Sequence, residues 1–404
     1  MPLVVQKFGG TSVADPDRIR AVADHIARTR KHGNDVIAVV SAMGKETDEL
    51  LHLAAQVSKT RPGREMDMLI TAGERKATAL VVMALHDLGI DAASFTGSQA
   101  EIITTNEHRN AKILEVRGNR LRQALEKGQV PVVGGAQGVS TDHDVTFLGR
   151  GGSDTTAVAL AHALGADACE LYTDVSGVFT ADPRIVPSAR RINKLSFDEM
   201  LEMCAVGCPK PEMRSVEFAR NFKVPLHVRS SFTWEPGTWI EEEDPTMEQP
   251  IISGVVADAS EAKVTVTGVP DKPGIAARLF RALADHDVNV DMIVQNVSTQ
   301  GHTDISFTVP KDDVEKSLEV ARAHVDDIGA EGVQADEDIA RVSLVGAGMK
   351  THPGVAATMF EVLADSGVNI DMISTSPIRI SCVVREQQAE HAVQALHTAF
   401  GLEN

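Results

Sequence analysis

The stretch Lys7-Phe8-Gly9-Gly10-Thr11-Ser12, close to the start of the chain, predicts a phosphate-binding turn. It follows the apolar run Leu3-Val4-Val5, which is typical of a buried β-strand. It precedes Asp15-Pro16, a helix N-cap residue followed by proline at the first helical position. The glycines let backbone N–H groups approach an anion, and the helix N-terminus and Lys7 add positive charge. The alternative is a tight strand-to-helix turn with a solvated lysine, and the six residues alone leave both open.

Apolar runs and segments of helical periodicity alternate beyond this turn. This alternation predicts an α/β fold with a mostly parallel sheet sandwiched by helices, in which ligands bind beyond the carboxyl ends of the strands. The turns Gly134-Gly135 and Gly149-Arg150-Gly151-Gly152-Ser153-Asp154 lie at such positions and support phosphate binding. We expect strands at 35–40, 92–95, 130–133, 169–174 and 225–229, and helices at 17–32, 47–58, 66–88 (interrupted near 71–75), 117–127, 155–164 and 196–222.

Composition excludes several classes of function. The 404 residues are too many for one core, and the net charge of −18 without a basic block argues against nucleic acid or anionic membrane as partner. No apolar run approaches the roughly 20 residues of a membrane span. The four cysteines are scattered, and no second Cys/His pair joins Cys204 and Cys208 to complete a zinc site. Free thiols and a reducing, cytoplasmic location are expected.

An internal repeat marks a second region. The acidic, proline-containing run 241–245 predicts a linker, so we expect one domain over 1–245 and another over 250–404. Within the latter, the sequence from Asp271 to Ile293 recurs 80 residues later, giving copies at about 262–335 and 340–404. Each copy predicts a strand, a Pro-Gly turn, an amphipathic helix of three turns, and a strand starting at Asn289 or Asn369. Neither copy buries much alone, so they should pack together or against another chain.

Taken together, these motifs resemble those of the aspartate kinase family over essentially the whole chain. The resemblance rests on the turns 7–12 and 149–154 and on Thr-Ala-Gly-Glu-Arg at 71–75, none of which matches a Walker loop or a dinucleotide fingerprint. It implies an amino-acid-kinase domain followed by two ferredoxin-like βαββαβ ACT modules. The implied reaction is ATP-dependent phosphorylation of the L-aspartate β-carboxylate to 4-phospho-L-aspartate, the first step of lysine, threonine and methionine biosynthesis. Mg²⁺ is expected to bridge the phosphates with few direct protein ligands.

The resemblance also assigns roles to individual residues. Lys7 would stabilise phosphoryl charge, Glu74 would bind the α-ammonium of aspartate, and Arg150 would bind its α-carboxylate bidentately. Asp154 would position Lys7 or the metal shell, unless it merely caps the following helix. The implied catalytic residues are Lys7, Glu74 and Asp154; the implied ATP-binding residues are Lys7, Phe8, Gly9, Gly10, Ser41, Ser153, Thr173, Asp174, Phe179, Thr180, Asp182 and Arg184; and the implied substrate-binding residues are Ser41, Thr47, Glu74, Gly135, Arg150, Gly151, Gly152 and Ser153.

Two stretches depart from the family pattern. In the segment Cys208–Met213, Lys210 arrives one position late between two prolines, so we exclude it from the ATP site. Pro377 stands where relatives often have an acidic residue, which would weaken sensitivity to lysine as effector.

Family precedent also implies feedback inhibition by lysine, threonine or both. Pairing of ACT modules across chains would give a homodimer or an α₂β₂ assembly, with Met247 as an internal start for a separate regulatory subunit. The implied effector-binding residues are Asp271, Lys272, Pro273, Gly274, Ile275, Ala276, Asn289, Asp291, Gln295, Val355, Ala356, Asn369, Ile370 and Ser376.

Two other functions remain open. One is a different amino-acid kinase, acting on glutamate, acetylglutamate or carbamate, which the ACT pair and the 71–75 segment disfavour. The other is a non-catalytic amino-acid sensor, which the presence of Lys7, Glu74, Arg150 and Asp154 disfavours.

Overall fold

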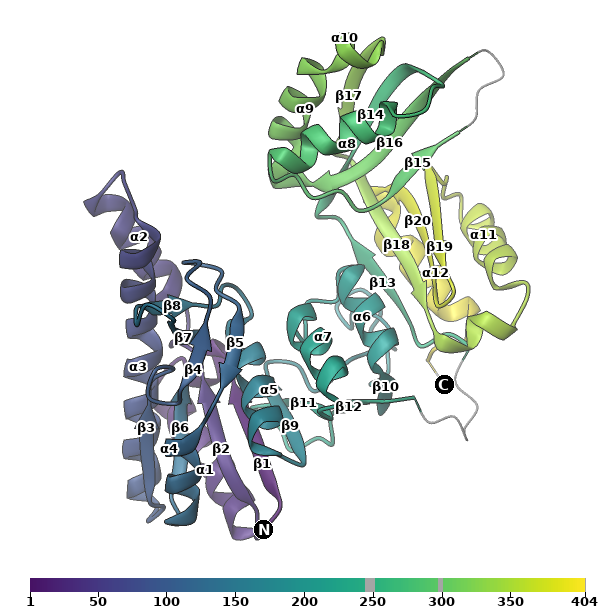
Figure 1. Cartoon of the computed structure of the whole chain (residues 1–404). Helices are drawn as coiled ribbons and strands as arrows, with labels where there is room; N and C mark the ends of the chain where they lie inside the picture. The colour runs from purple at the N-terminus through teal and green to yellow at the C-terminus, as the bar shows by residue number, and fades with distance from the viewer. Residues whose placement is uncertain (244–250, 297–300, 404) are drawn as a thin grey trace. The chain divides into compact units, whose positions relative to one another are not determined.

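A computed structural model describes residues 1–243, 251–296 and 301–403. The chain forms two compact units (Figure 1). The first comprises Met1–Val178 and Arg191–Thr246, and the second comprises Phe179–Arg190 and Met247–Asn404. The predicted domain boundary near 245–250 and the predicted internal start at Met247 lie outside the described residues.

Within its described part, the first unit is built on an eight-stranded sheet with the order β10-β12-β11-β9-β1-β2-β6-β3. Only β11 and β12 run antiparallel to each other among these neighbours. The strands are β1 (Leu3–Phe8), β2 (Asp35–Val40), β3 (Ala92–Phe95), β6 (Val130–Gly134), β9 (Ala168–Thr173), β10 (Lys194–Ser196), β11 (Leu226–Ser230) and β12 (Thr238–Glu241).

Helices cover both faces of this sheet, which confirms the predicted fold class. On one face, Phe8 and Val132 pack against Ile26 of α1 and Val81 of α3. On the other, α5 contacts β1, β2 and β9. The helices of this unit are α1 (Pro16–Lys31), α2 (Glu46–Val57), α3 (Gly63–Asp87), α4 (Asn119–Glu126), α5 (Gly152–Leu164), α6 (Phe197–Ala205) and α7 (Met213–Phe222).

Local sequence signals explain some helix boundaries and fail at others. Asp15 caps α1 by accepting a hydrogen bond from the Arg18 amide, as predicted from Asp15-Pro16. The predicted interruption near 71–75 is wrong, because α3 runs continuously through Gly73. A Cβ at Gly73 would lie 2.8 Å from the Ala42 Cβ, so this glycine allows close packing. The predicted helix 196–222 is two helices, α6 and α7, separated by a segment that contains Pro209 and Pro211.

A second, smaller sheet in the first unit was not predicted. Its order is β5-β4-β7-β8, and β8 leads directly into the turn at 149–154. The strands are β4 (Ile102–Thr104), β5 (Ile113–Val116), β7 (Gln137–Ser140) and β8 (Val145–Phe147).

The second unit contains two antiparallel four-stranded sheets in its described residues, each with helices packed on it. The first sheet has the order β15-β16-β14-β17 and the predicted βαββαβ sequence of elements. Its elements are β14 (Glu261–Pro270), α8 (Ile275–Asp285), β15 (Ile293–Gln295), β16 (His302–Pro310), α9 (Val314–Ala323), α10 (Val325–Ile328) and β17 (Gly332–Asp336).

The second sheet has the order β13-β18-β20-β19. Its outer strand β13 comes from the chain before the first module, so the first module is inserted into the second. The predicted strand starts at Asn289 and Asn369 are wrong: β15 begins at Ile293 and β19 at Met372, after acidic loop residues that form ion pairs. The elements are β13 (Gly254–Asp258), β18 (Ile339–Val345), α11 (Val355–Asp365), β19 (Met372–Ser376), β20 (Arg379–Arg385) and α12 (Ala389–Ala399).

The segment Phe179–Arg190 connects β9 to β10 in the sequence but belongs to the second unit. Its residues Ala181 and Val186 are buried in the same core as Leu396. The Val255 amide donates a hydrogen bond of 2.7 Å to the Thr180 carbonyl. Part of the chain expected to bind nucleotide is therefore held by residues of the second unit.

None of the helices in the described part of the chain combines the length and apolar character that a membrane crossing requires.

Candidate active site and effector region

Lys7 and Asp154 form a buried ion pair. Lys7 Nζ lies 2.6 Å from Asp154 Oδ1, and the two side chains are 8% and 5% exposed. Lys7 comes from β1 and Asp154 from the first turn of α5, where Gly151 is the N-cap residue. Asp154 therefore does not cap α5, and its carboxylate neutralises and holds the buried ammonium group.

The glycines after Lys7 are required by close packing. A Cβ at Gly9 would lie 3.4 Å from Lys7 Nζ, and one at Gly10 would lie 2.9 Å from the Ala42 carbonyl oxygen. The Gly9 amide donates to the Tyr172 carbonyl at 3.3 Å. Phe8 is fully buried and its ring stacks on Tyr172, so only its backbone is left for a ligand. Space around the Lys7 ammonium is thus kept free of side chains from this turn.

A serine pair joins three elements beside this turn. Ser41, just after β2, donates a hydrogen bond of 2.9 Å to Ser153 Oγ at the start of α5. A Cβ at Gly135, just after β6, would lie 2.5 Å from Ser153 Oγ. The predicted residues Ser41, Gly135 and Ser153 are therefore close neighbours at the carboxyl edge of the sheet.

Glu74 is a buried carboxylate on α3 that faces the same edge. It is 3% exposed, and a Cβ at Gly134 would lie 3.4 Å from the Glu74 Cβ. Burial, assisted by the nearby Glu46 charge, raises the pKa of Glu74 to about 7, although backbone hydrogen bonds to the carboxylate, including one from Ala42, oppose the rise. Among the described residues, Glu74 Oε2 has no hydrogen-bond partner. A ligand ammonium group would satisfy this oxygen and favour the ionised form.

Arg150 lies in the glycine turn before α5, with an exposed side chain. The flanking Gly149 and Gly151 have φ of +87° and +71°, which glycine adopts without strain. A Cβ at Gly151 would lie 2.1 Å from Glu212 Cγ. A larger residue at 151 would therefore displace Glu212.

Glu212 is a residue of this site that the sequence analysis missed. Burial raises the pKa of Glu212; the Asp154 charge adds to the rise, while Lys210 and Arg150 oppose it. Its carboxylate is thus electrostatically coupled to two of the predicted site residues. The one available signal was the atypical segment 208–213, which contains Glu212.

The remaining predicted residues lie in several places. Thr47 is in the first turn of α2, and at the end of β9 the Thr173 hydroxyl donates to Asp174 Oδ1 at 2.9 Å. In the second unit, Thr180 is buried with its hydroxyl 2.9 Å from His397 Nε2. The exposed Arg184 pairs with Asp182 at 2.6 Å, and Phe179 is half-buried in the same segment.

No group of three or more His, Cys, Asp or Glu side chains in the described ranges is arranged to hold a metal ion.

The predicted effector residues of the second unit include two engaged carboxylates. Asp291 pairs with Arg341, and Asp371 lies 3.4 Å from Lys263 and 3.0 Å from Arg385. Asp291 of the first module therefore reaches Arg341 on β18 of the second, and Asp371 of the second reaches Lys263 on β14 of the first. These reciprocal pairs link the two modules.

The Pro-Gly turns have the geometry of helix N-termini. Gly274 and Gly354 are the N-cap residues of α8 and α11, with φ of +93° and +101°. The following amides, from Ile275-Ala276 and Val355-Ala356, open these helices.

The other predicted effector residues lie around these turns and strands. Asn289 and Gln295 are exposed, and Asn369 donates a hydrogen bond to Asp371 at 3.4 Å. Ile370 packs against the core of the second module, and Ser376 Oγ accepts a hydrogen bond from the Ile378 amide at 3.3 Å. Asp271, Lys272 and Pro273 are exposed residues of the first turn.

Comparison with known proteins identifies similar chains. The amino acid kinase family matches residues 2–230, and the ACT domain matches residues 264–324 and 342–400. An aspartokinase of Mycolicibacterium smegmatis is 58% identical over 407 residues, which cover 100% of this chain and 97% of the relative.

Two crystal structures of E. coli aspartokinase III are similar over nearly their full length. The complex with aspartate and ADP aligns with a TM-score of 0.83 at 25% identity, covering 98% of this chain and 99% of that one. The complex with lysine and aspartate aligns with a TM-score of 0.78 at the same identity and coverage.

Proposed function

Because the chain belongs to the aspartate kinases of the amino acid kinase family, we propose that it phosphorylates the β-carboxylate of L-aspartate, using ATP, as the first step of lysine, threonine and methionine biosynthesis. The product is 4-phospho-L-aspartate. The observation that carries this proposal is the buried pair Lys7–Asp154 at the same sheet edge as Glu74, whose Oε2 has no hydrogen-bond partner among the described residues. A phosphoryl-stabilising cation and an ammonium-binding anion are the two charges that the reaction needs.

The chemistry requires no general base. The β-carboxylate has an ordinary pKa near 4 and is ionised at neutral pH, so the barrier is repulsion between two anions. Lys7 would neutralise charge that develops on the γ-phosphoryl group, and Asp154 keeps its ammonium group in place through the 2.6 Å contact. Catalysis would thus come from positioning and charge neutralisation.

Substrate recognition would use opposite charges at its two ends. Ionised Glu74 would accept hydrogen bonds from the α-ammonium group, and the Arg150 guanidinium would bind the α-carboxylate in a bidentate manner. Ser41 and Ser153 would supply hydroxyl groups between them, and Thr47 lies in the neighbouring α2. Aspartate would therefore be held by its zwitterionic end, leaving the β-carboxylate directed to the phosphoryl group.

The nucleotide would be held mainly by backbone and hydroxyl groups. We assign Gly10 to the phosphates, and also Gly9, which leaves space beside the Lys7 ammonium group while its amide donates to the Tyr172 carbonyl. We assign Thr173 and Asp174 to the nucleoside side of the site; Phe179, Thr180, Asp182 and Arg184 remain proposed contacts. Carboxylate oxygens suit Mg²⁺, and Asp154 and Glu212 are the acidic groups beside the glycine turn. When bound, Mg²⁺ would offset phosphate charge.

Effector binding is assigned to the Pro-Gly turns of the two ACT modules. Helices α8 and α11 each begin at a left-handed glycine, so their first amides can hold the carboxylate of an amino acid. Lysine, threonine or both are the proposed inhibitors, since an E. coli relative was crystallised with lysine. Pairing of these modules between chains, in a homodimer or an α₂β₂ assembly in the cytoplasm, is part of the same proposal.

One assay separates this function from the alternatives. ADP release is followed with aspartate, with glutamate and without an amino acid, and lysine and threonine are then added singly and together. The proposal expects ADP release that requires aspartate and is inhibited by at least one effector. Preference for glutamate would indicate another amino-acid kinase, and absence of turnover would indicate a sensor.

A further inference from the structure

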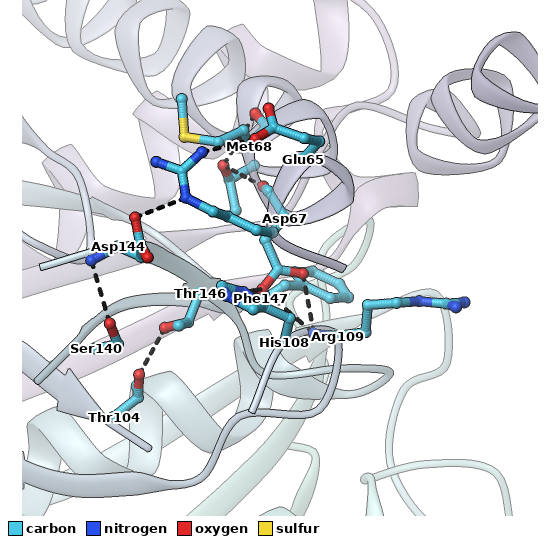
Figure 2. Close-up of polar contacts among 12 residues, drawn as sticks. Glu65, Asp67, Met68, Thr104, His108, Arg109, Ser140, Asp144, Thr146 and Phe147 are labelled. Atoms are coloured by element: carbon cyan, nitrogen blue, oxygen red, sulfur yellow. Dashed lines mark hydrogen bonds and ion pairs between the residues drawn. The ribbon is translucent and has the colours of Figure 1, made fainter. Parts of the chain in front are cut away.

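Asp67 is a fully buried carboxylate on α3 that lies outside the proposed catalytic set. Figure 2 shows it between three segments of the chain. Its Oδ2 accepts hydrogen bonds from His108 Nδ1 at 2.8 Å and from the Phe147 amide at 3.1 Å, and its Oδ1 accepts from the Arg109 amide at 3.0 Å. A carboxyl group buried to this extent is costly unless its oxygens are hydrogen-bonded. The cluster therefore fixes α3, the β4–β5 loop and β8 together.

Two of these contacts lead to the turn that carries Arg150. Phe147 is the last residue of β8 and lies three positions before Arg150. The Arg109 carbonyl lies 3.3 Å from the position that a Cβ on Gly149 would occupy. Arg109 itself has a left-handed φ of +69°, and Figure 2 shows its guanidinium group directed away from Asp67. The carboxylate thus holds the backbone on two sides of the turn.

The third connection runs along α3 to Glu74. Asp67 and Glu74 are seven positions apart on one continuous helix, about two turns, and both are buried. The same helical face therefore carries the proposed ammonium-binding group and the group that ties down the Arg150 turn. His108 fits closely here, since a Cβ at Gly63 would lie 2.7 Å from the His108 Cβ.

We propose that Asp67 is a positioning residue for aspartate recognition: it sets the distance between Glu74 and the Arg150 turn by binding His108 and the amides of Arg109 and Phe147. This inference rests on the proposed function, because it needs Glu74 and Arg150 to bind the two ends of one zwitterion. The turn at 7–12 makes none of these contacts, and the contacts meet the 149–154 turn at Gly149, beside Arg150, and not at Asp154, so the role concerns aspartate more than nucleotide.

The test is the change in KM for each substrate in Asp67→Asn. Asparagine fills the same volume and keeps one acceptor oxygen, but its NH₂ group would face N–H donors of His108, Arg109 or Phe147. This repulsion should shift the turn that carries Arg150 without leaving a cavity. We expect the KM for aspartate to rise about 10-fold or more, with the KM for MgATP within about two-fold of wild type.

Asp144→Asn is the matched control. Asp144 pairs with Arg64 at 2.8 Å and so also connects α3 to the β7–β8 hairpin, but Figure 2 shows no hydrogen bond or ion pair from it to His108 or Arg109. Its loss should leave both KM values unchanged. An aspartate KM within about two-fold of wild type in Asp67→Asn, or an equal rise in both KM values, would overturn the inference.

A second variant covers the case in which Asp67→Asn does not fold. His108→Ala removes one partly exposed donor and keeps both backbone contacts. It should raise the aspartate KM selectively by about three-fold or more, and a folded His108→Ala enzyme with wild-type KM values would contradict the inference. If the wild-type protein shows no aspartate-dependent ADP release, the proposed function itself is wrong. If the wild-type protein is active and the variants keep its KM values, only the role of Asp67 is wrong.

Discussion

The ammonium nitrogen of Lys7 lies 2.6 Å from a carboxylate oxygen of Asp154, and both side chains are almost entirely buried. The two residues are far apart in the sequence and meet because α5 packs on the face of β1 that carries Lys7. A buried cation has few ways to satisfy its charge. Asp154 is therefore the group that holds the Lys7 ammonium group in place through this ion pair.

Removal of the Asp154 charge should impair turnover more than binding. In Asp154→Asn the Lys7 ammonium loses its fixed partner, so we expect kcat to fall about 10²- to 10³-fold, with smaller changes in either KM. Asp167→Asn is the control, since Asp167 accepts from the Leu3 amide at the opposite end of the sheet. Steady-state kinetics with a coupled ADP assay checks this, and a kcat within about two-fold of wild type would refute the role of Asp154.

Arg150→Ala should act on aspartate alone. Loss of a charge-assisted interaction costs about 1.5–3 kcal/mol, which corresponds to a rise in the aspartate KM of about 10- to 100-fold. The KM for ATP should change little, and because the side chain is exposed the fold should be unaffected. Equal increases in both KM values would remove Arg150 from the α-carboxylate site.

Glu74 should make aspartate use pH-dependent near neutrality. Burial raises the pKa of Glu74 to about 7, and only the ionised carboxylate pairs with the substrate ammonium group. At saturating MgATP, kcat/KM for aspartate should therefore rise with pH through about 7 and level off above it, while the substrate carboxylates stay ionised. Glu74→Gln should lower kcat/KM and abolish this rise. A profile of the variant parallel to that of wild type would assign the titration to another group.

The same pKa has a consequence for stability. The folded state holds the Glu74 proton more tightly than the unfolded state does, so protonation of Glu74 adds to the free energy of unfolding. This stabilisation is fully present below the ordinary pKa of 4.5 and is lost as pH rises through about 7. The free energy of unfolding of Glu74→Gln should fall less over this interval than that of wild type. Denaturant unfolding at several pH values measures the difference, and identical pH dependence in the two proteins would contradict it.

Lys210→Ala should leave the KM for ATP unchanged. The residue is exposed between Pro209 and Pro211, and its carbonyl accepts a hydrogen bond from Cys208 Sγ at 3.4 Å. The backbone there is restrained independently of the lysine side chain. A several-fold increase in the KM for ATP would restore Lys210 to the nucleotide site.

Arg341→Met should destabilise the second unit. The Arg341 side chain is 2% exposed and faces Asp258, Glu261 and Asp291, so its removal leaves three carboxylates without their shared cation. We expect a loss of about 3 kcal/mol in the free energy of unfolding. Lys311→Met, which breaks the exposed pair with Glu386, should cost less than about 1 kcal/mol. Similar losses in the two variants, measured by urea unfolding, would contradict this assignment.

Elements with strong local signals could be predicted from the sequence. Three such signals each involve only a few neighbouring residues: the apolar run before Lys7, the cap at Asp15 and the Ala-rich segment after Asp154. The observed bounds of β1, α1 and α5 agree with the predictions made from them. The helix interruption near Gly73 was predicted from the same kind of signal and is wrong, because that glycine serves packing against Ala42.

Features that depend on distant segments could not be predicted. Strand β4 has three residues and is placed in its sheet by pairing with the distant strand β7, which begins at Gln137. Strand β13 completes a module whose other strands begin at Ile339. Glu212 reaches the glycine turn only because α7 folds back onto α5. No local pattern carries information on such contacts.

Trapping of the acyl phosphate tests the central claim most directly. With ATP, Mg²⁺ and aspartate, added hydroxylamine should convert the product to aspartyl β-hydroxamate in an amount equal to the ADP released. Glutamate should give neither product, and Arg150→Ala should need far more aspartate to reach the same rate. ADP release that is independent of aspartate, or that occurs without hydroxamate, would contradict phosphoryl transfer to the β-carboxylate.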